Sequence, residues 1–160
     1  LESDLYLPAN AKKLPEIVSD TIDPAKLEGI VIDDEDAELT GNWAHGEGLK
    51  PFVGRYYSYT GQAGASARFS FAVKETGKYD VVVFWQPHAN RAKTAPVTVL
   101  TGESENTFTL NQTKSTGTPN GSHKLGTFNF TAGSEAAVIF RTAGSQGNVH
   151  IDAVQIVPAK

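Results

Sequence analysis

The stretch KYDVVVFWQ, residues 78–86, decides the fold class. It begins with alternating polar and apolar side chains and then becomes apolar at every position from Val81 to Trp85. Alternation is typical of a strand with one buried face, whereas a continuous run of β-branched and aromatic residues is typical of a strand buried on both faces. We therefore expect residues 78–86 to form a central strand of a packed sheet.

Segments on both sides of this strand repeat a pattern of short strand and polar turn. Turns bearing Gly, Asn or Ser separate further expected strands at residues 29–33, 55–60, 66–73, 96–101, 107–112, 123–130, 136–142 and 149–157. About nine strands without a long helical pattern predict an all-β fold. The expected architecture is a jelly-roll β-sandwich made of two antiparallel sheets.

The composition agrees with a single β domain. The chain has 160 residues, of which 39% are hydrophobic and 15 are glycines, enough for one well-filled core. It has no cysteine, which excludes disulfides, thiolate metal sites and a cysteine nucleophile. No apolar run is long enough to cross a bilayer, so we expect no membrane partner.

The first 28 residues differ from the rest of the chain. Prolines interrupt them and their apolar residues show no period, which predicts a linker or arm at 1–28 and a sandwich domain at 29–160. Within the arm, residues 23–29 carry a capping Asp, a Pro at the first helical position and a closing Gly, so one short helical turn is expected. Because the first residue is not Met, we expect the chain to be a piece of a longer protein or a processed form.

Charge is unevenly distributed along the chain. Residues 1–38 hold 11 of the 18 acidic side chains, whereas after residue 38 basic side chains outnumber acidic ones by 11 to 7. This mildly basic part is compatible with an anionic polymer. Its Lys and Arg are scattered rather than clustered, so we expect no nucleic-acid partner.

The densest charge feature is DDEDAE at residues 33–38. Carboxylate oxygens are the ligands that Ca²⁺ prefers, but the run lacks the glycine of an EF-hand loop and the spacing to its terminal glutamate. Two interpretations stay open. The run is either a solvated turn or part of a metal site made of Asp34, Asp36 and a distant carboxylate, for which Asp152 is the candidate.

Motifs of catalytic sites are absent from the sequence. It contains no phosphate-binding glycine loop and no G-x-S-x-G nucleophile elbow, and few carboxylates follow residue 38. A small polysaccharide hydrolase or lyase would need groups such as His45 and Glu47 to converge with a second carboxylate in one pocket. We expect the chain itself not to be an enzyme.

Loop aromatics beside planar polar groups are the candidate sugar-binding residues. Sugars stack on aromatic faces and bond to amide, carboxylate or guanidinium groups through vicinal hydroxyls. A structural role in the core or as a loop brace remains the alternative for each candidate. The candidates are Trp43, His45, Tyr56, His88, Asn90 and Arg91.

Three segments resemble one family. WQPHANRAKTAPVTV at 85–99 is similar to the W…NRA…APxTV signature of golvesin-like domains, also called xanthan-lyase-associated carbohydrate-binding domains. LGTFNF at 125–130 and VHIDAVQIV at 149–157 resemble their LGTFxF strand and closing strand. The similarity extends over residues 30–157, with GRYY at 54–57 standing at a GxxY element.

The resemblance implies a galactose-binding-like jelly roll appended to a bacterial polysaccharide lyase, peptidase or FAD-dependent oxidoreductase. The attached catalytic domain would then lie N-terminal to residue 1. In related carbohydrate-binding modules, an early acidic segment and an aspartate on the last strand share a structural Ca²⁺, which points again to Asp34, Asp36 and Asp152.

The resulting expectation is a non-catalytic, carbohydrate-binding accessory module of a secreted multidomain enzyme, periplasmic or extracellular. Its partner would be a polysaccharide, neutral or anionic. The alternative is a structural domain that orients an attached catalytic domain without binding sugar.

Overall fold

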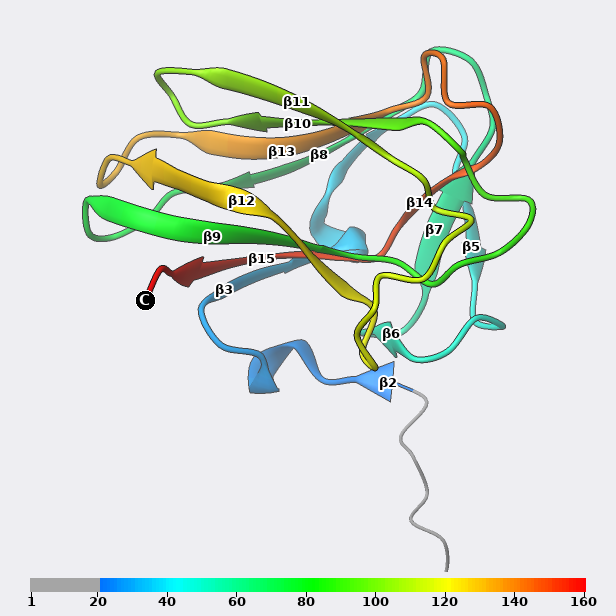
Figure 1. Ribbon diagram of the computed structural model, residues 1–160, viewed down its shortest axis with the longest axis horizontal. Coiled ribbons are helices and arrows are strands. Elements are labelled where there is room, and N and C mark those ends of the chain that lie inside the picture. Colours follow the sequence, from blue (N-terminus) through cyan, green and yellow to red (C-terminus); the bar gives the residue numbers. More distant parts are fainter. Residues whose placement is uncertain (1–20) are drawn as a thin grey trace, which may run out of the picture.

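The computed structural model describes residues 21–160, and within them almost all regular structure is β (Figure 1). Two large antiparallel sheets lie face to face, and a smaller sheet closes one end. Two short 3₁₀ helices, η1 (Pro24–Lys26) and η2 (Asp34–Asp36), complete the described elements, and neither has the length and apolarity to cross a membrane. The linker or arm expected at residues 1–28 lies outside the described residues over positions 1–20.

The first large sheet has five strands, all paired antiparallel. Its expected strands form within two residues of the predicted bounds. Only the edge strand β4 was missed, since three residues are too few to show alternation. In spatial order the strands are β11 (Glu105–Leu110), β10 (Ala95–Leu100), β13 (Ala136–Arg141), β8 (Ser66–Phe71) and β4 (Glu38–Thr40).

The second large sheet has four antiparallel strands, with β9 in an inner position, as the continuous apolar run predicts. A register shift between Lys124 and Gly126 marks a bulge in β12. In spatial order the strands are β12 (Ser122–Phe130), β9 (Gly77–Phe84), β15 (Ala153–Pro158) and β3 (Ile30–Asp33).

Two small sheets lie at the end of the sandwich. The three-stranded one consists of β14 (Val149–Ile151), β7 (Tyr57–Thr60) and β5 (Ala44–Gly46), all antiparallel. The other pairs β2 (Thr21–Ile22) in parallel with β6 (Phe52–Val53). Together these sheets position the loops that carry the candidate site residues.

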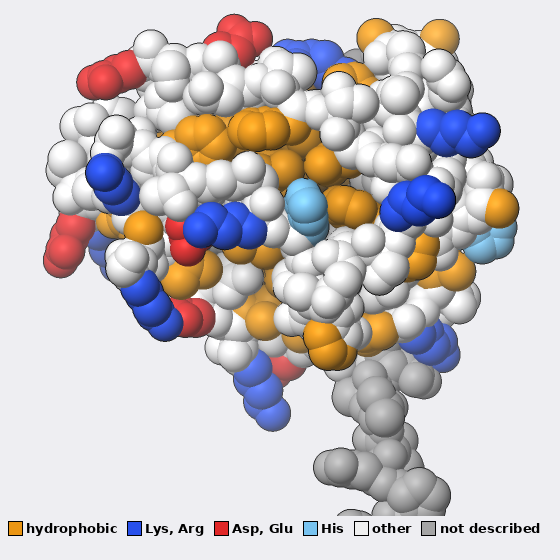
Figure 2. Space-filling model, in the orientation of Figure 1, with side chains coloured by type: hydrophobic (Ala, Val, Ile, Leu, Met, Phe, Trp, Pro, Cys, Tyr) orange, Lys and Arg blue, Asp and Glu red, His pale blue; other side chains and the backbone are white. Residues whose placement is uncertain are grey.

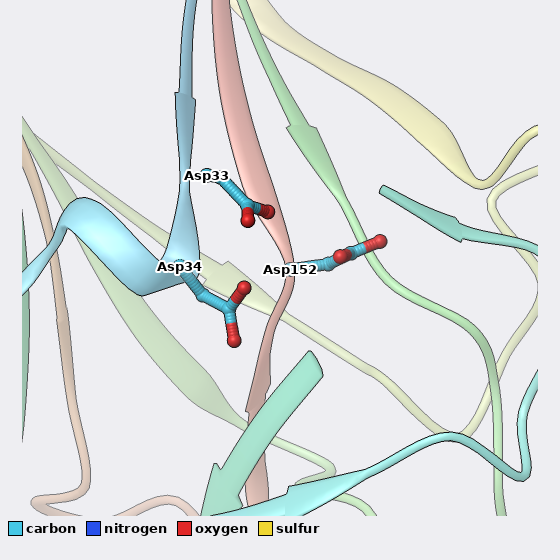
Figure 3. Close-up of side chains that lie close together, drawn as sticks. All are labelled: Asp33, Asp34 and Asp152. Atoms are coloured by element: carbon cyan, nitrogen blue, oxygen red, sulfur yellow. The ribbon is translucent and has the colours of Figure 1, made fainter. Parts of the chain in front are cut away.

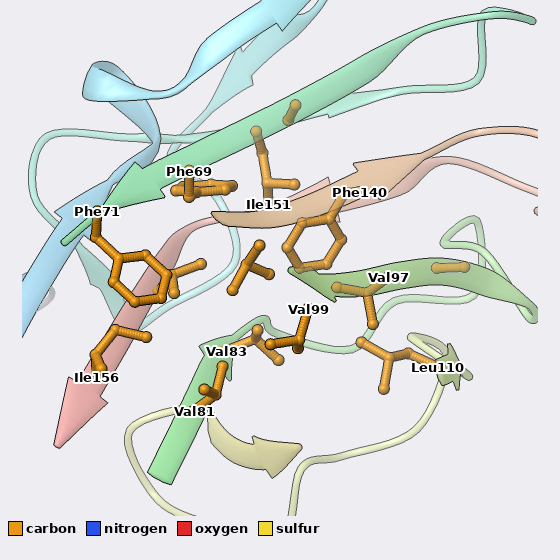
Figure 4. Packing of buried hydrophobic residues seen from close by; sticks show 14 of the residues in the cluster. Phe69, Phe71, Val81, Val83, Val97, Val99, Leu110, Phe140, Ile151 and Ile156 are labelled. Carbon is orange, nitrogen blue, oxygen red and sulfur yellow. The ribbon is translucent and has the colours of Figure 1, made fainter. Parts of the chain in front are cut away.

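The core fills the space between the two large sheets (Figure 4). Alternation along β8 buries Ala67, Phe69 and Phe71 while Arg68 and Ser70 stay half-exposed. Each buried ring contributes roughly 1.5–3 kcal/mol through the apolar surface removed from water. A contiguous cluster of this kind supports the all-β jelly-roll fold that the sequence predicts.

Strand β9 is covered on both faces. Val81 and Val83 lie in the main core, whereas Val82 packs with Ile22 and Leu27 on the opposite face. Residues 21–28, expected as part of an arm, therefore pack on the sandwich. They include η1 (Pro24–Lys26), where the Asp23 side chain accepts from the Ala25 amide.

The edge where β11 and β12 border the two sheets is partly apolar. Phe108 and Phe128 are half-buried there, with ring centroids 6.0 Å apart in an edge-on arrangement. Figure 2 shows an apolar band across this face, with basic side chains spread around it rather than gathered in one stripe.

Candidate functional site

The closing strand expected at residues 149–157 is broken at Asp152. The part before the break, β14, pairs with β7 in the end sheet, whereas the part after it, β15, joins β9 and β3. Asp152 thus stands where the chain passes from one sheet to another. Its backbone oxygen accepts from the amide of Asp34, which ties this junction to the start of η2 (Asp34–Asp36).

Three buried carboxyls meet at this junction (Figure 3). Asp33 comes from the end of β3, Asp34 from the first turn of η2 and Asp152 from the strand break, and each offers an oxygen within 4.8 Å of the others'. Their exposed fractions are 6%, 1% and 2%. We call Asp33, Asp34 and Asp152 the acidic triad.

Hydrogen bonds satisfy only part of the acidic triad. Asp152 accepts from the Val53 amide at 3.0 and 3.1 Å, and Asp34 Oδ2 accepts from Ser58 Oγ at 2.6 Å. Asp33 Oδ1 and Asp34 Oδ1 are buried without a partner. Buried polar atoms normally have partners, so these two oxygens call for a donor or a cation.

The pKa values of the acidic triad also indicate that its carboxyls need a proton or a cation. Burial raises the pKa of Asp33 to about 6 and that of Asp34 to about 8, and it raises the pKa of Asp152 well above its ordinary value. The mutual repulsion of the carboxylates adds to the effect. In residues 21–160 no Lys or Arg pairs with these carboxyls; the nearby Arg55 pairs with Glu35 instead.

The acidic triad fits a hard divalent cation such as Ca²⁺. Carboxylate oxygens are its preferred ligands, and the unpartnered oxygens of Asp33 and Asp34 are available for it. Gly54 lies beside the Asp33 carboxyl and leaves it space, because a Cβ on Gly54 would come 2.4 Å from Asp33 Oδ2. The chemistry of the donor set therefore matches the ion that the sequence suggested.

The structure brings together two of the three residues expected to bind metal. Asp34 and Asp152 belong to the acidic triad, whereas Asp36, at the end of η2, is exposed and lies outside it. Asp33 is the third member of the acidic triad instead of Asp36. The sequence missed Asp33 because the direction of its side chain depends on where β3 ends and η2 begins.

Strand β7 separates the acidic triad from a second group of side chains. Alternation along β7 sends Ser58 to the side of Asp34, while Tyr57 and Tyr59 lie on the opposite face. Gly46, opposite Tyr57 in the register, leaves room for that ring, since a Cβ there would come 2.7 Å from it.

The two tyrosines pack with Arg91 and His150. The Arg91 guanidinium carbon lies 4.3 Å from the ring centroid of Tyr59 and 5.7 Å from that of Tyr57. His150 stacks on Tyr57 with centroids 4.5 Å apart. Arg91 Nε donates to His150 Nδ1 at 2.9 Å, and Arg91 Nη1 donates to Asn90 Oδ1 at 2.7 Å.

His150 is held as a neutral ring. Its backbone pairs with the side chain of Gln112 in both directions, and burial lowers its pKa well below the ordinary value. Since Nδ1 accepts from Arg91, the neutral ring carries its proton on Nε2, which is buried without a partner. Sequence reasoning did not select His150, because its contacts come from residues far away in the chain.

Tyr57, Tyr59 and Arg91 border a small pocket at the end of the sandwich. Its volume is about 280 Å³, and the exposed His88 and Asn90 stand beside the buried Arg91. His88 Nδ1 accepts from the backbone amide of Asn90 at 3.0 Å, and this hydrogen bond orders the loop. The pocket is lined by Gly48, Leu49, Tyr57, Tyr59, His88, Asn90 and Arg91; we call it the Arg91 pocket.

The other three expected sugar-binding residues lie outside the Arg91 pocket. Trp43 is half-buried against the main core, and its Nε1 donates to the Thr40 carbonyl. His45 and Tyr56 pack ring to ring, with centroids 4.0 Å apart, and His45 Nδ1 lies 3.1 Å from Ser58 Oγ. His45 and Tyr56 thus lie together, whereas the contacts of Trp43 are with the main core and with Thr40.

A further hollow of about 530 Å³ is bordered by both large sheets, away from these groups. Its lining includes Ile30, Phe71, Val73 and Tyr79, which present few polar groups to a sugar. Although it is larger, it lacks the combination of rings, amide and guanidinium found in the Arg91 pocket.

Comparisons with known proteins agree with this architecture. Xanthan lyase from Bacillus sp. (strain GL1) is 28% identical over 156 residues, covering 91% of this chain and 16% of the lyase. The solved structure of Paenibacillus xanthan lyase matches with a TM-score of 0.74 and 31% identity, over 81% of this chain and 13% of that one. The chain thus spans less than a fifth of either lyase.

A family 35 carbohydrate binding module from Clostridium thermocellum shares the fold, with a TM-score of 0.58 and 13% identity over 81% of this chain and 98% of the module. The predicted jelly-roll fold is thereby confirmed. The predicted family is confirmed as well, because the model of the Golvesin C-terminal domain matches residues 30–158. Since this match covers most of the sequence, the chain belongs to the Golvesin C-terminal domain family.

Proposed function

We propose that this chain is a carbohydrate-binding accessory module that keeps an attached enzyme close to polysaccharide. The observation that carries the proposal is the Arg91 pocket, in which the Tyr59 ring, the Asn90 amide and the Arg91 guanidinium border one hollow. Aromatic faces hold the C–H surface of a sugar, while planar polar groups bond its hydroxyls.

The relatives support an enzyme as the attached partner. Two xanthan lyases each contain a segment similar to this chain, and a family 35 module with the same fold is known in a mannanase from Podospora anserina. In our proposal the catalytic domain lies N-terminal to residue 1, and the whole protein acts outside the cytoplasm on polysaccharide.

The proposed role is non-catalytic. None of the residues that line the Arg91 pocket is a carboxylate, so the pair of acids that most glycoside hydrolases use is missing from it. The carboxylates of the acidic triad are too deeply buried to meet a substrate. These two observations support binding without hydrolysis, and the lyase assay described below tests for cleavage by other groups.

The acidic triad has a structural role in this proposal, as the site of a Ca²⁺ ion held by Asp33, Asp34 and Asp152. A bound Ca²⁺ would supply positive charge to the two unpartnered oxygens and crosslink the end of β3 to the break before β15. Because Asp34 accepts from Ser58, the same group also fixes β7, whose tyrosines border the Arg91 pocket.

Affinity electrophoresis through gels that contain soluble bacterial polysaccharides tests the proposal. We expect at least one polysaccharide to retard the protein, and Tyr59→Ala to abolish the retardation. Tyr56→Ala is the matched control, because Tyr56 packs with His45 outside the Arg91 pocket. Ultraviolet absorbance of unsaturated products serves as the assay for lyase activity.

Three outcomes would contradict the proposal. Loss of retardation in Tyr56→Ala but not in Tyr59→Ala would move the binding surface to the His45–Tyr56 pair. Cleavage of a polysaccharide would make the chain an enzyme. No retardation with any polysaccharide would favour a structural domain that orients the attached enzyme.

A further inference from the structure

The guanidinium of Arg91 is a buried cation without an acidic partner. The residue is 4% exposed, and no carboxylate within residues 21–160 forms an ion pair with it. Its Nε and Nη1 donate to a neutral imidazole and a neutral amide, and its Nη2 has no hydrogen bond in the described part of the chain. Burying a charge without a counter-charge costs free energy.

Neutral neighbours offset only part of this cost. The rings of Tyr57 and Tyr59 attract the cation, with Tyr59 the closer. Burial nevertheless lowers the pKa of Arg91 below its ordinary value. The positive charge therefore remains uncompensated, and an anionic group arriving from outside would form a charge-assisted hydrogen bond where little water competes.

The surroundings of Arg91 admit such a group. Arg91 borders a pocket of about 280 Å³. This volume lies just below the range of roughly 300–1,000 Å³ that is usual for ligand sites, and it suits a single sugar ring. The residues that line the pocket include no Asp or Glu that would repel an anion.

We infer that the Arg91 pocket takes a sugar that carries a carboxylate, with Arg91 Nη2 donating to that carboxylate and Tyr59 beside the ring. The inference rests on the proposed carbohydrate-binding function and specifies the class of sugar. A neutral sugar would leave the charge of Arg91 unpaired, whereas a uronic acid residue pairs it.

The first test changes the ligand and leaves the protein intact. Oligosaccharides from a glucuronate-containing polysaccharide are titrated into the protein, and calorimetry measures their binding. The same oligosaccharides are titrated after their carboxyls have been reduced to primary alcohols, which converts each glucuronate residue to glucose. We expect the reduction to weaken binding by about tenfold or more, since one charge-assisted pair is lost.

The second test supplies an internal competitor. Asn90 is exposed and its Oδ1 already lies 2.7 Å from Arg91 Nη1, so Asn90→Asp places a carboxylate on the same atoms without a change of shape. We expect Asn90→Asp to weaken binding of the glucuronate oligosaccharides by about tenfold while the melting temperature is kept or raised. Asn129→Asp, exposed at the far end of β12, carries the same charge change and should bind as the wild type does (Figure 1).

The outcomes separate this inference from the proposed function. Equal binding of native and carboxyl-reduced oligosaccharides would overturn the inference and leave a sugar-binding module. Binding of neither oligosaccharide nor of any other polysaccharide would overturn both. Wild-type affinity in Asn90→Asp, or equal weakening in Asn90→Asp and Asn129→Asp, would show that no carboxylate pairs with Arg91.

Discussion

The side chain of Asp34 lies between the other acids and strand β7. Its Oδ2 accepts from Ser58, its Oδ1 has no partner, and burial raises its pKa to about 8. An ionised Asp34 therefore requires a cation, whereas a protonated one does not. The stability of the folded protein should therefore depend on whether a proton or Ca²⁺ occupies the acidic triad.

The first prediction concerns pH. The folded pKa values of Asp33 and Asp34, about 6 and about 8, exceed the ordinary value of about 3.9. At pH values between the ordinary and the folded pKa, the folded state therefore binds more protons than the unfolded state. The cost of ionising these carboxyls is absent below about pH 4 and fully present above about pH 8. The rise in melting temperature on adding CaCl₂ in place of EDTA should therefore grow from pH 4 to pH 8.

Thermal unfolding followed by circular dichroism in both buffers gives this difference at each pH. Comparing the two buffers removes the effect of His150, whose lowered pKa makes the protein less stable as the pH falls below about 6.5 in either buffer. A melting temperature that CaCl₂ leaves unchanged at pH 8 would contradict the metal site.

The second prediction compares two aspartates in one turn. Asp34→Asn removes a buried oxygen ligand and should abolish the CaCl₂-dependent rise in melting temperature, whereas Asp36→Asn, on an exposed side chain, should keep it. In EDTA at pH 8, Asp34→Asn should be at least as stable as the wild type, since it removes a buried charge. Loss of the response in both variants would restore the ligand set expected from the sequence, and a response kept in Asp34→Asn would contradict the acidic triad.

The sequence predicts part of this residue-scale pattern. Asp34 and Asp152 follow from an early acidic run and an aspartate in the closing strand. The choice between Asp33 and Asp36 does not, because it depends on a single 3₁₀ turn and on the partners of that turn across the molecule. A local turn of three residues leaves no period in the sequence.

At the scale of elements, the loop between β6 and β7 holds the acidic triad against the end sheet. Gly54 in this loop has φ of +76° and donates its amide to the Ile22 carbonyl, and a Cβ built on it would collide with the carboxylate of Asp33. A side chain at this position would have to push Asp33 aside. The glycine is therefore required for space as well as for its backbone conformation.

The third prediction separates these two requirements. Gly64 also has φ of +76°, but nothing lies within 4 Å of a Cβ built on it, so Gly64→Ala should cost only the strain of the left-handed conformation, about 1 kcal/mol. Gly54→Ala should cost about 1–3 kcal/mol more, because its Cβ would come 2.4 Å from Asp33 Oδ2. Chemical denaturation of both variants measures the difference. Equal losses would show that the loop relaxes freely.

Long strands were predictable and short ones were not. The strands with six or more residues, such as β8 and β9, show alternation or a continuous apolar run that a single sequence reveals. Strands β4, β5 and β6 have three residues or fewer, which is too short for any period. The break at Asp152 was also missed, because both halves of the closing segment are buried and apolar on either side of it.

At the scale of the whole molecule, the Arg91 pocket is assembled from distant parts of the chain. Side chains or backbone from positions 48–49, 57, 59, 88 and 90–91 line it, and His150 reaches Arg91 from 59 positions away. Sequence patterns selected His88, Asn90 and Arg91 but could not bring Tyr59 and His150 to them. The contacts between these residues depend on how the end sheet folds over the two large sheets.

The most direct measurement of the central claim is an NMR titration of the isotope-labelled protein with oligosaccharides from acidic and neutral bacterial polysaccharides. The amide signals of residues 48–49, 57–59 and 88–91 should shift together on addition of a sugar, and those around the hollow bordered by Phe71 and Tyr79 should not. Shifts that gather at the second hollow, or no shifts with any sugar, would contradict the account.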